Sequence, residues 1–81
     1  MQTKLLREIQ GAYDNLRKSE KLVADFILKH PADVVDSTMA QAAEKMSVSE
    51  PTLNRFCKAL NYSGFNEFKL TLAQQRAADE Y

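Results

Sequence analysis

Between residues 50 and 58, side chains that can read base pairs recur at the spacing of one helical face. If the apolar residues of this segment face a core, its polar side chains point outward: Glu50, Pro51, Asn54 and Lys58, with Thr52 and Arg55 on the flanks. Asparagine can form two hydrogen bonds to adenine, arginine or lysine can bond guanine, and threonine can contact the thymine methyl group. This pattern predicts a helix that lies in the major groove of DNA.

Groups suited to phosphate or to a base edge lie at the start of the same helix. Its free backbone N–H groups can bind a phosphate, with the hydroxyls of Ser47 and Ser49 beside them. We include Thr38, at the start of the preceding helix, among the candidate DNA contacts. Glu50 has two interpretations, because its carboxylate can accept from the cytosine amino group or favour the positive end of the helix dipole.

The elements that position these side chains are two capped helices joined by a very short turn at Ser47-Val48. Thr38 and Gln41 fit a capping box, while Ser49 caps the second helix. Helices joined so tightly cross steeply and need small residues at their contact, which Ala42 and Ala43 supply. This arrangement predicts a helix-turn-helix whose second helix enters the major groove.

Apolar residues spaced three and four apart predict three further helices. The first runs from about residue 3 to 15, and the second starts with Ser19 as its cap and ends before Pro31. We expect Pro31–Asp36 to be a loop that Val34 and Val35 anchor. The last helix should start with Ser63 as its cap and continue to about residue 76, with a frayed tail over residues 77–81. The fold class is therefore an all-α, five-helix helix-turn-helix domain.

Length and composition are consistent with one small cytoplasmic domain. The chain has 81 residues, of which 44% are hydrophobic, and it has one cysteine. No stretch approaches the roughly 20 apolar residues of a membrane span. We found no nucleophile–base pair, glycine-rich phosphate loop or metal-ligand cluster, so we expect neither an enzyme nor a cofactor. Cys57 falls on the apolar stripe and is expected to be buried, and His30 is interpreted as a helix-end residue.

The charge balance leaves an alternative open. Eleven basic and eleven acidic residues give a net charge of zero, whereas nucleic-acid-binding domains usually have a basic surface. A helical module that binds protein or dimerises, without reading DNA, would fit the same helices. One positive face is still possible if the second and fifth helices flank the reading helix, formed by Arg17, Lys18, Lys21, Arg55, Lys58 and Lys69. A homodimer would compensate for weak binding by presenting two reading helices to half-sites about 34–36 Å apart.

Several segments resemble the N-terminal helix-turn-helix domain of the RpiR family of bacterial transcription regulators. They are residues 49–58 (SEPTLNRFCK), 64–65 (GF), 67–70 (EFKL), and 19–21 (SEK) with 24–27 (ADFI) and Pro31. The Pro-Thr and Asn-Arg pairs are most similar to the hexose-catabolism regulator (HexR-like) branch. Ser47 departs from the glycine common at the tight turn of many helix-turn-helix proteins.

The resemblance implies sequence-specific binding of operator DNA by residues 1–76 and control of sugar-catabolism genes. It also implies a dimer and a C-terminal sugar isomerase (SIS) domain that binds a phosphorylated sugar effector. That domain is not among these 81 residues, and residues 77–81 would lead to it.

Overall fold

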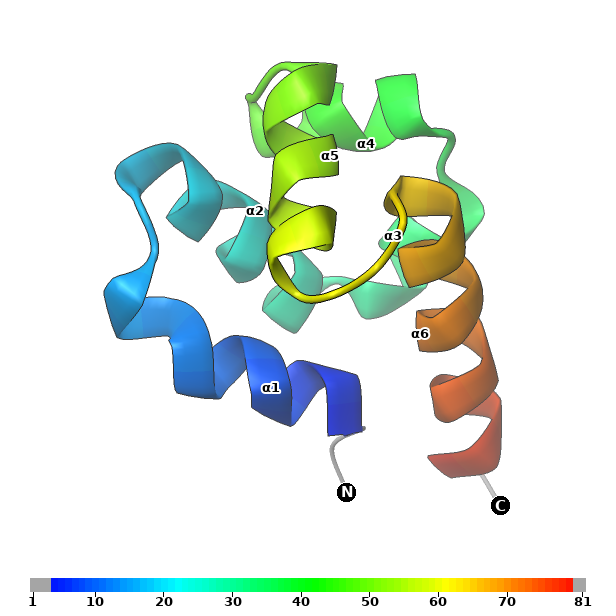
Figure 1. Cartoon of the computed structure of the whole chain (residues 1–81). Helices are drawn as coiled ribbons and strands as arrows, with labels where there is room; N and C mark the ends of the chain where they lie inside the picture. Colours follow the sequence, from blue (N-terminus) through cyan, green and yellow to red (C-terminus); the bar gives the residue numbers. More distant parts are fainter. Residues whose placement is uncertain (1–3, 80–81) are drawn as a thin grey trace.

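The computed structural model describes residues 4–79, which form α-helices and one 3-10 turn and contain no strand (Figure 1). The elements are α1 (Lys4–Ala12), η1 (Tyr13–Asn15), α2 (Lys18–Lys29), α3 (Pro31–Asp36), α4 (Met39–Met46), α5 (Glu50–Ala59) and α6 (Phe65–Asp79). The all-α class expected from the sequence is confirmed. None of the helices in this part of the chain combines the length and apolar character needed to cross a membrane.

The segment Pro31–Asp36 is a helix, so the expectation of a loop there was wrong. Pro31 does end α2, but it also occupies the first turn of α3, where its fixed φ suits a helix and its missing N–H leaves no hydrogen bond unmade. Val34 is fully buried and Val35 is half-buried, so these residues anchor the segment as expected. Pro31 therefore marks the change of direction between α2 and α3.

Two expected caps are also corrected by the structure. Ser19 lies inside the first turn of α2, which starts one residue earlier, and the backbone N–H of Arg17 donates to the Glu20 carboxylate at 2.9 Å. Ser63 lies one residue too early to cap α6. Its N–H and hydroxyl instead donate to the Glu67 carboxylate at 3.3 and 3.2 Å. In both cases a glutamate that follows at short range accepts from the residue ahead of the helix.

Helix α6 continues through Asp79, three residues beyond the expected end of its regular pattern. Alanine has the highest helix propensity, so Ala77 and Ala78 can extend a helix without an apolar face. The rest of the expected frayed tail lies outside the described residues. Near this end of α6, the Gln75 side-chain oxygen accepts the backbone N–H of Leu5 at 2.8 Å. This bond joins the first turn of α1 to α6, at the end of the molecule opposite to the α4–α5 turn (Figure 1).

Ser37 connects three helices through hydrogen bonds that the sequence did not indicate. The residue is 1% exposed, and its hydroxyl donates to the Asp33 carbonyl at 2.6 Å and accepts from Lys45 Nζ at 3.0 Å. Its carbonyl accepts from Lys69 Nζ at 3.1 Å. The end of α3 is thereby tied to α4 and α6, which fixes the first helix of the helix-turn-helix on the body of the domain.

The corner between α4 and α5 is made by Ser47, Val48 and Ser49. Ser47 adopts the left-handed conformation, with φ 61° and ψ 39°, and the Val48 N–H donates to the Ala43 carbonyl at 3.0 Å. This bond is the hallmark of a Schellman ending, which usually has glycine at the left-handed position. The serine therefore accepts the strain that a glycine would avoid.

Replacing Ser47 with glycine should stabilise the domain. Relief of the left-handed strain, about 1–2 kcal/mol, exceeds the added entropy of the unfolded chain, about 0.4–1 kcal/mol. We expect urea denaturation to give an unfolding free energy for Ser47→Gly higher by about 0.5–1 kcal/mol. Ser49→Gly is the matched control, because Ser49 has φ −79° and its hydroxyl caps α5. This control should not be stabilised. A lower unfolding free energy for Ser47→Gly would contradict the assignment of backbone strain to Ser47.

Cys57 is fully buried on the inner face of α5, which confirms its expected place in the core. Burial disfavours the thiolate and raises the pKa of Cys57 to about 12. In an unfolded chain the thiol ionises near pH ~8.5. Above that pH the unfolded state therefore binds fewer protons than the native state, so alkali must lower the stability.

Between pH 9 and pH 11 we expect the unfolding free energy to fall by up to about 1.4 kcal/mol per pH unit from Cys57 alone. The pKa values of Tyr13, hydrogen-bonded to Asp25, and of half-buried Tyr62 are also raised, and both add losses of the same sign at higher pH. Denaturation of wild type and Cys57→Ala across this range isolates the thiol, because both keep the tyrosines. Parallel pH profiles for the two proteins would contradict this assignment.

Candidate nucleic-acid interface

Helix α5 has the orientation expected from its apolar stripe. Leu53, Phe56 and Cys57 are at most 1% exposed, and the helix packs against α2, α4 and α6. Phe56 makes an edge contact with Phe68 of α6, with ring centroids 6.4 Å apart. The apolar side is therefore fixed on three helices, and the opposite side of α5 is left for a ligand.

The outward side of α5 carries the polar residues predicted from the sequence. Glu50, Pro51, Arg55 and Lys58 are exposed, and Asn54 is half-buried between them. Glu50 lies in the first turn and Lys58 in the last, where each charge is favoured by the helix dipole. The side chains predicted to read base edges thus lie on one accessible face of a rigid helix.

Asn54 lies close to the loop before α6. A Cβ atom at Gly64 would lie 2.9 Å from Asn54 Oδ1, which is closer than real Cβ contacts. A side chain at position 64 would therefore have to displace the Asn54 amide. The Asn54 side chain lies next to the loop before α6, a proximity that the sequence did not indicate.

Hydroxyl groups at the start of α5 form a short chain that ends on Arg55. The Ser49 hydroxyl accepts the Thr52 N–H at 3.3 Å and lies 2.9 Å from Thr52 Oγ1. Arg55 Nη2 in turn donates to Thr52 Oγ1 at 3.5 Å. Ser49 is therefore the cap predicted from the sequence, and Arg55 reaches back along the helix to Thr52.

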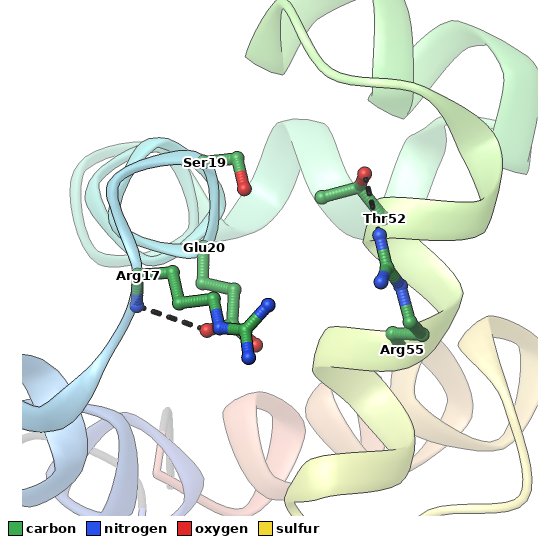
Figure 2. Close-up of a pocket in the computed structure, with 5 residues that line it drawn as sticks. All are labelled: Arg17, Ser19, Glu20, Thr52 and Arg55. Atoms are coloured by element: carbon green, nitrogen blue, oxygen red, sulfur yellow. Dashed lines mark hydrogen bonds between the residues drawn. The ribbon is translucent and has the colours of Figure 1, made fainter.

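Arg55 and Thr52 face the start of α2 across a cleft of about 270 Å³ (Figure 2). The opposite wall is formed by Arg17, Ser19 and Glu20. The Arg17 side chain extends from the residue just before α2 toward α5, while Arg55 runs along α5 toward Thr52 (Figure 2). Two arginines far apart in the sequence thus border one space beside the reading helix.

The other residues of the predicted positive face are placed differently. Lys69 is half-buried, bonded to the Ser37 carbonyl, and lies 5.7 Å from the centre of the Phe65 ring. Lys21 lies over the Tyr13 ring at 5.4 Å. Both lysines contact other parts of the domain, while Arg55 and Lys58 are exposed on α5, and Arg17 and Lys18 are exposed at the start of α2.

Two further candidate residues are exposed at the two ends of α4, Thr38 before its first turn and Ser47 after its last. Thr38 caps α4, accepting the Gln41 N–H at 3.2 Å while its own N–H donates to the Gln41 side chain at 3.0 Å. Ser47 is exposed at the corner itself. Their hydroxyls lie at the surface, and the expected capping box is confirmed.

Residues suited to other chemistry do not gather in the part of the chain that the structure describes. It holds no group of three or more histidine, cysteine or acidic residues placed to bind a metal ion. His30 lies between α2 and α3, with its ring 5.3 Å from that of Phe26. The helix-end position expected for His30 is thus confirmed.

Comparison with known proteins gives the same assignment. Residues 3–79 match the helix-turn-helix domain of the rpiR family. The HTH-type transcriptional regulator HexR of Escherichia coli is 45% identical over 73 residues, which are 90% of this chain and 25% of that protein. The chain therefore spans about a quarter of the length of the curated relative.

Two solved structures have the same fold. The N-terminal domain of ybbH from Bacillus subtilis superposes with a TM-score of 0.85 at 33% identity, covering 94% of this chain and 93% of that one. The Vibrio vulnificus NanR protein, complexed with ManNAc-6P, gives a TM-score of 0.90 at 30% identity over 94% of this chain and 29% of its own. Both are similar to this chain over nearly its whole length.

The two glycines should respond oppositely to alanine. Gly64→Ala must displace the Asn54 amide and replaces glycine ahead of α6, so we expect the unfolding free energy to fall by about 0.5–1 kcal/mol. A Cβ atom at Gly11 would meet nothing within 4 Å, and Gly11 lies in a helix. The control Gly11→Ala should therefore raise the unfolding free energy by about 0.5–1 kcal/mol. The side-chain amide resonances of Asn54 should shift in Gly64→Ala and stay in place in the control. Unmoved resonances in both would show that Gly64 does not restrain Asn54.

Proposed function

The chain belongs to the RpiR family of helix-turn-helix domains, and from this premise we propose that α5 reads operator DNA in the major groove. Domains of this class bind DNA in transcription regulators and are not enzymes. The observation that carries the proposal is the orientation of α5. Its apolar side is buried on three helices, and its outward face presents groups that bond base edges.

Within this interface we assign the residues by their chemistry. Asn54 and Thr52 are the candidates for base contacts, because amide and hydroxyl groups bond base edges and both lie on the first turns of α5. Lys58, in the last turn, is suited to phosphate, and Glu50 and Pro51 border the groove at the start of the helix. We assign the exposed hydroxyls of Thr38, Ser47 and Ser49 to contacts with the sugar–phosphate backbone.

The whole protein is proposed to regulate bacterial sugar-catabolism genes in the cytoplasm. NanR, a structural neighbour, is complexed with ManNAc-6P, which supports a phosphosugar effector for a protein of this family. Such an effector would bind through a C-terminal SIS domain beyond residues 77–81. A homodimer is also proposed, because two copies of α5 would double the contacts of a domain whose net charge is zero.

The proposal is tested by selecting random duplexes with this domain at low salt. We expect enrichment of one short motif and an affinity that falls steeply as salt rises, since each neutralised phosphate adds about 0.9 to the slope of log K against log salt. A helical module that binds another protein through apolar surface would enrich no motif and would respond little to salt. That result would exclude DNA reading in favour of protein interaction.

Two substitutions on α5 should separate base reading from backbone binding. Asn54→Ala should weaken binding to the selected duplex by about 1–3 kcal/mol and binding to a random duplex much less. Lys58→Ala should weaken binding to both duplexes equally and lower the slope of log K against log salt by about 0.9. Lys4→Ala is the control, since this exposed residue starts α1 next to Leu5, whose N–H bonds Gln75 near the end of α6. Equal losses on both duplexes for Asn54→Ala would remove its reading role.

A further inference from the structure

We propose that the cleft between α2 and α5 binds one phosphate of the DNA backbone, held jointly by Arg17 and Arg55. The inference rests on the proposed function and deepens it. It makes Arg55 a residue that fixes the position of the helix on the duplex, leaving base contacts to other side chains of α5.

The chemistry of the cleft matches one phosphodiester group. Its lining consists of two guanidinium groups, one carboxylate and two hydroxyls, a formal charge of +1. A backbone phosphate carries one negative charge and accepts hydrogen bonds from arginine and from hydroxyl groups alike. The volume of about 270 Å³ holds such a group together with several waters, each of which needs about 30 Å³.

The direction of Arg55 argues against a base contact. An arginine that bonds guanine must extend from the helix into the groove. Arg55 instead follows the helix surface to Thr52 and borders the space in front of α2 (Figure 2). Its hydrogen bond is long, at 3.5 Å, so the guanidinium can turn to a phosphate without losing a strong interaction.

The location of the cleft also suits the backbone of the duplex. A helix in the major groove has the sugar–phosphate strands along both of its flanks, and contacts to them set its register. The cleft flanks α5, and its second wall is the start of α2 (Figure 2). One strand would therefore pass between the two helices while α5 occupies the groove.

Glu20 opposes the phosphate and provides a way to test it. Its carboxylate is half-buried in the wall of the cleft and accepts the Arg17 N–H. Glutamine at this position keeps an oxygen for that bond and removes the negative charge. Glu20→Gln should therefore bind every duplex more tightly, by about two- to fivefold, since a surface charge acts through a high dielectric.

The principal experiment measures DNA affinity against salt for Arg17→Ala, Arg55→Ala and the double variant, on a selected and a random duplex. Each single variant should lose about 0.9 in salt slope and bind about eightfold more weakly at 0.1 M salt, equally on both duplexes. Because both arginines hold the same phosphate, the double variant should lose little more than either single one. Lys4→Ala, the exposed residue at the start of α1, is again the control and should match wild type.

Each other outcome contradicts a stated part of the proposal. Additive slopes, about 1.8 in the double variant, would mean two separate phosphates. A loss confined to the selected duplex would make Arg55 a base reader, and an unchanged slope in Arg17→Ala would remove α2 from the interface. In all of these cases wild type still binds DNA, whereas failure of the proposed function would show as wild type that binds no duplex.

Inorganic phosphate separates the backbone from a small phosphorylated ligand. Free phosphate would use the same guanidinium groups, so it is titrated at constant ionic strength while the Arg17 and Arg55 side-chain resonances are followed. We expect no saturation below about 10 mM, because a single exposed anion lacks the neighbouring contacts of a duplex. Saturation in the micromolar range would assign the cleft to a small phosphate ligand and overturn the proposal.

Discussion

The three-residue corner between α4 and α5 is the constraint on which the rest of this domain depends. So short a connection brings the two helices into contact, and the contact is possible because Ala42 and Ala43 are small and buried. Ser47 adopts a left-handed backbone conformation at the change of direction, and the Ser49 hydroxyl caps the start of α5. Once the corner is fixed, the apolar stripe of α5 meets the core in one rotation, and this rotation decides which polar residues face outward.

A chain with no net charge can still present a basic surface if its charges are sorted by their contacts. Glu67 accepts the backbone N–H of Ser63 ahead of α6, and Lys69 is bonded to the carbonyl of Ser37. These charges act within the fold. The basic groups that remain exposed at α5 include Arg55 and Lys58, so the local potential is set by placement and not by the overall count.

The sequence predicted what depends on local pattern and missed what depends on contacts between distant segments. Apolar spacing was enough to orient α5, and the cap residues Thr38 and Ser49 were recognised because their bonds span three positions. Pro31 was misread, since a proline that ends one helix can equally begin the next. The hydrogen bonds of Ser37 and the proximity of Gly64 to Asn54 join different elements, and a lone serine or glycine in the sequence carries no sign of such a partner.

The division of labour around α5 follows from how its side chains are held. A base reader must keep a fixed direction, because discrimination between bases depends on the geometry of hydrogen bonds. Asn54 is the candidate for this task, because it is half-buried on the outward face with its amide oxygen next to Gly64. A side chain that binds phosphate needs length more than a fixed direction, because the oxygens of a phosphodiester accept hydrogen bonds from a wide range of angles. Arg55, resting on Thr52 through one long hydrogen bond and facing Arg17 across an open cleft, has the freedom that this second task requires.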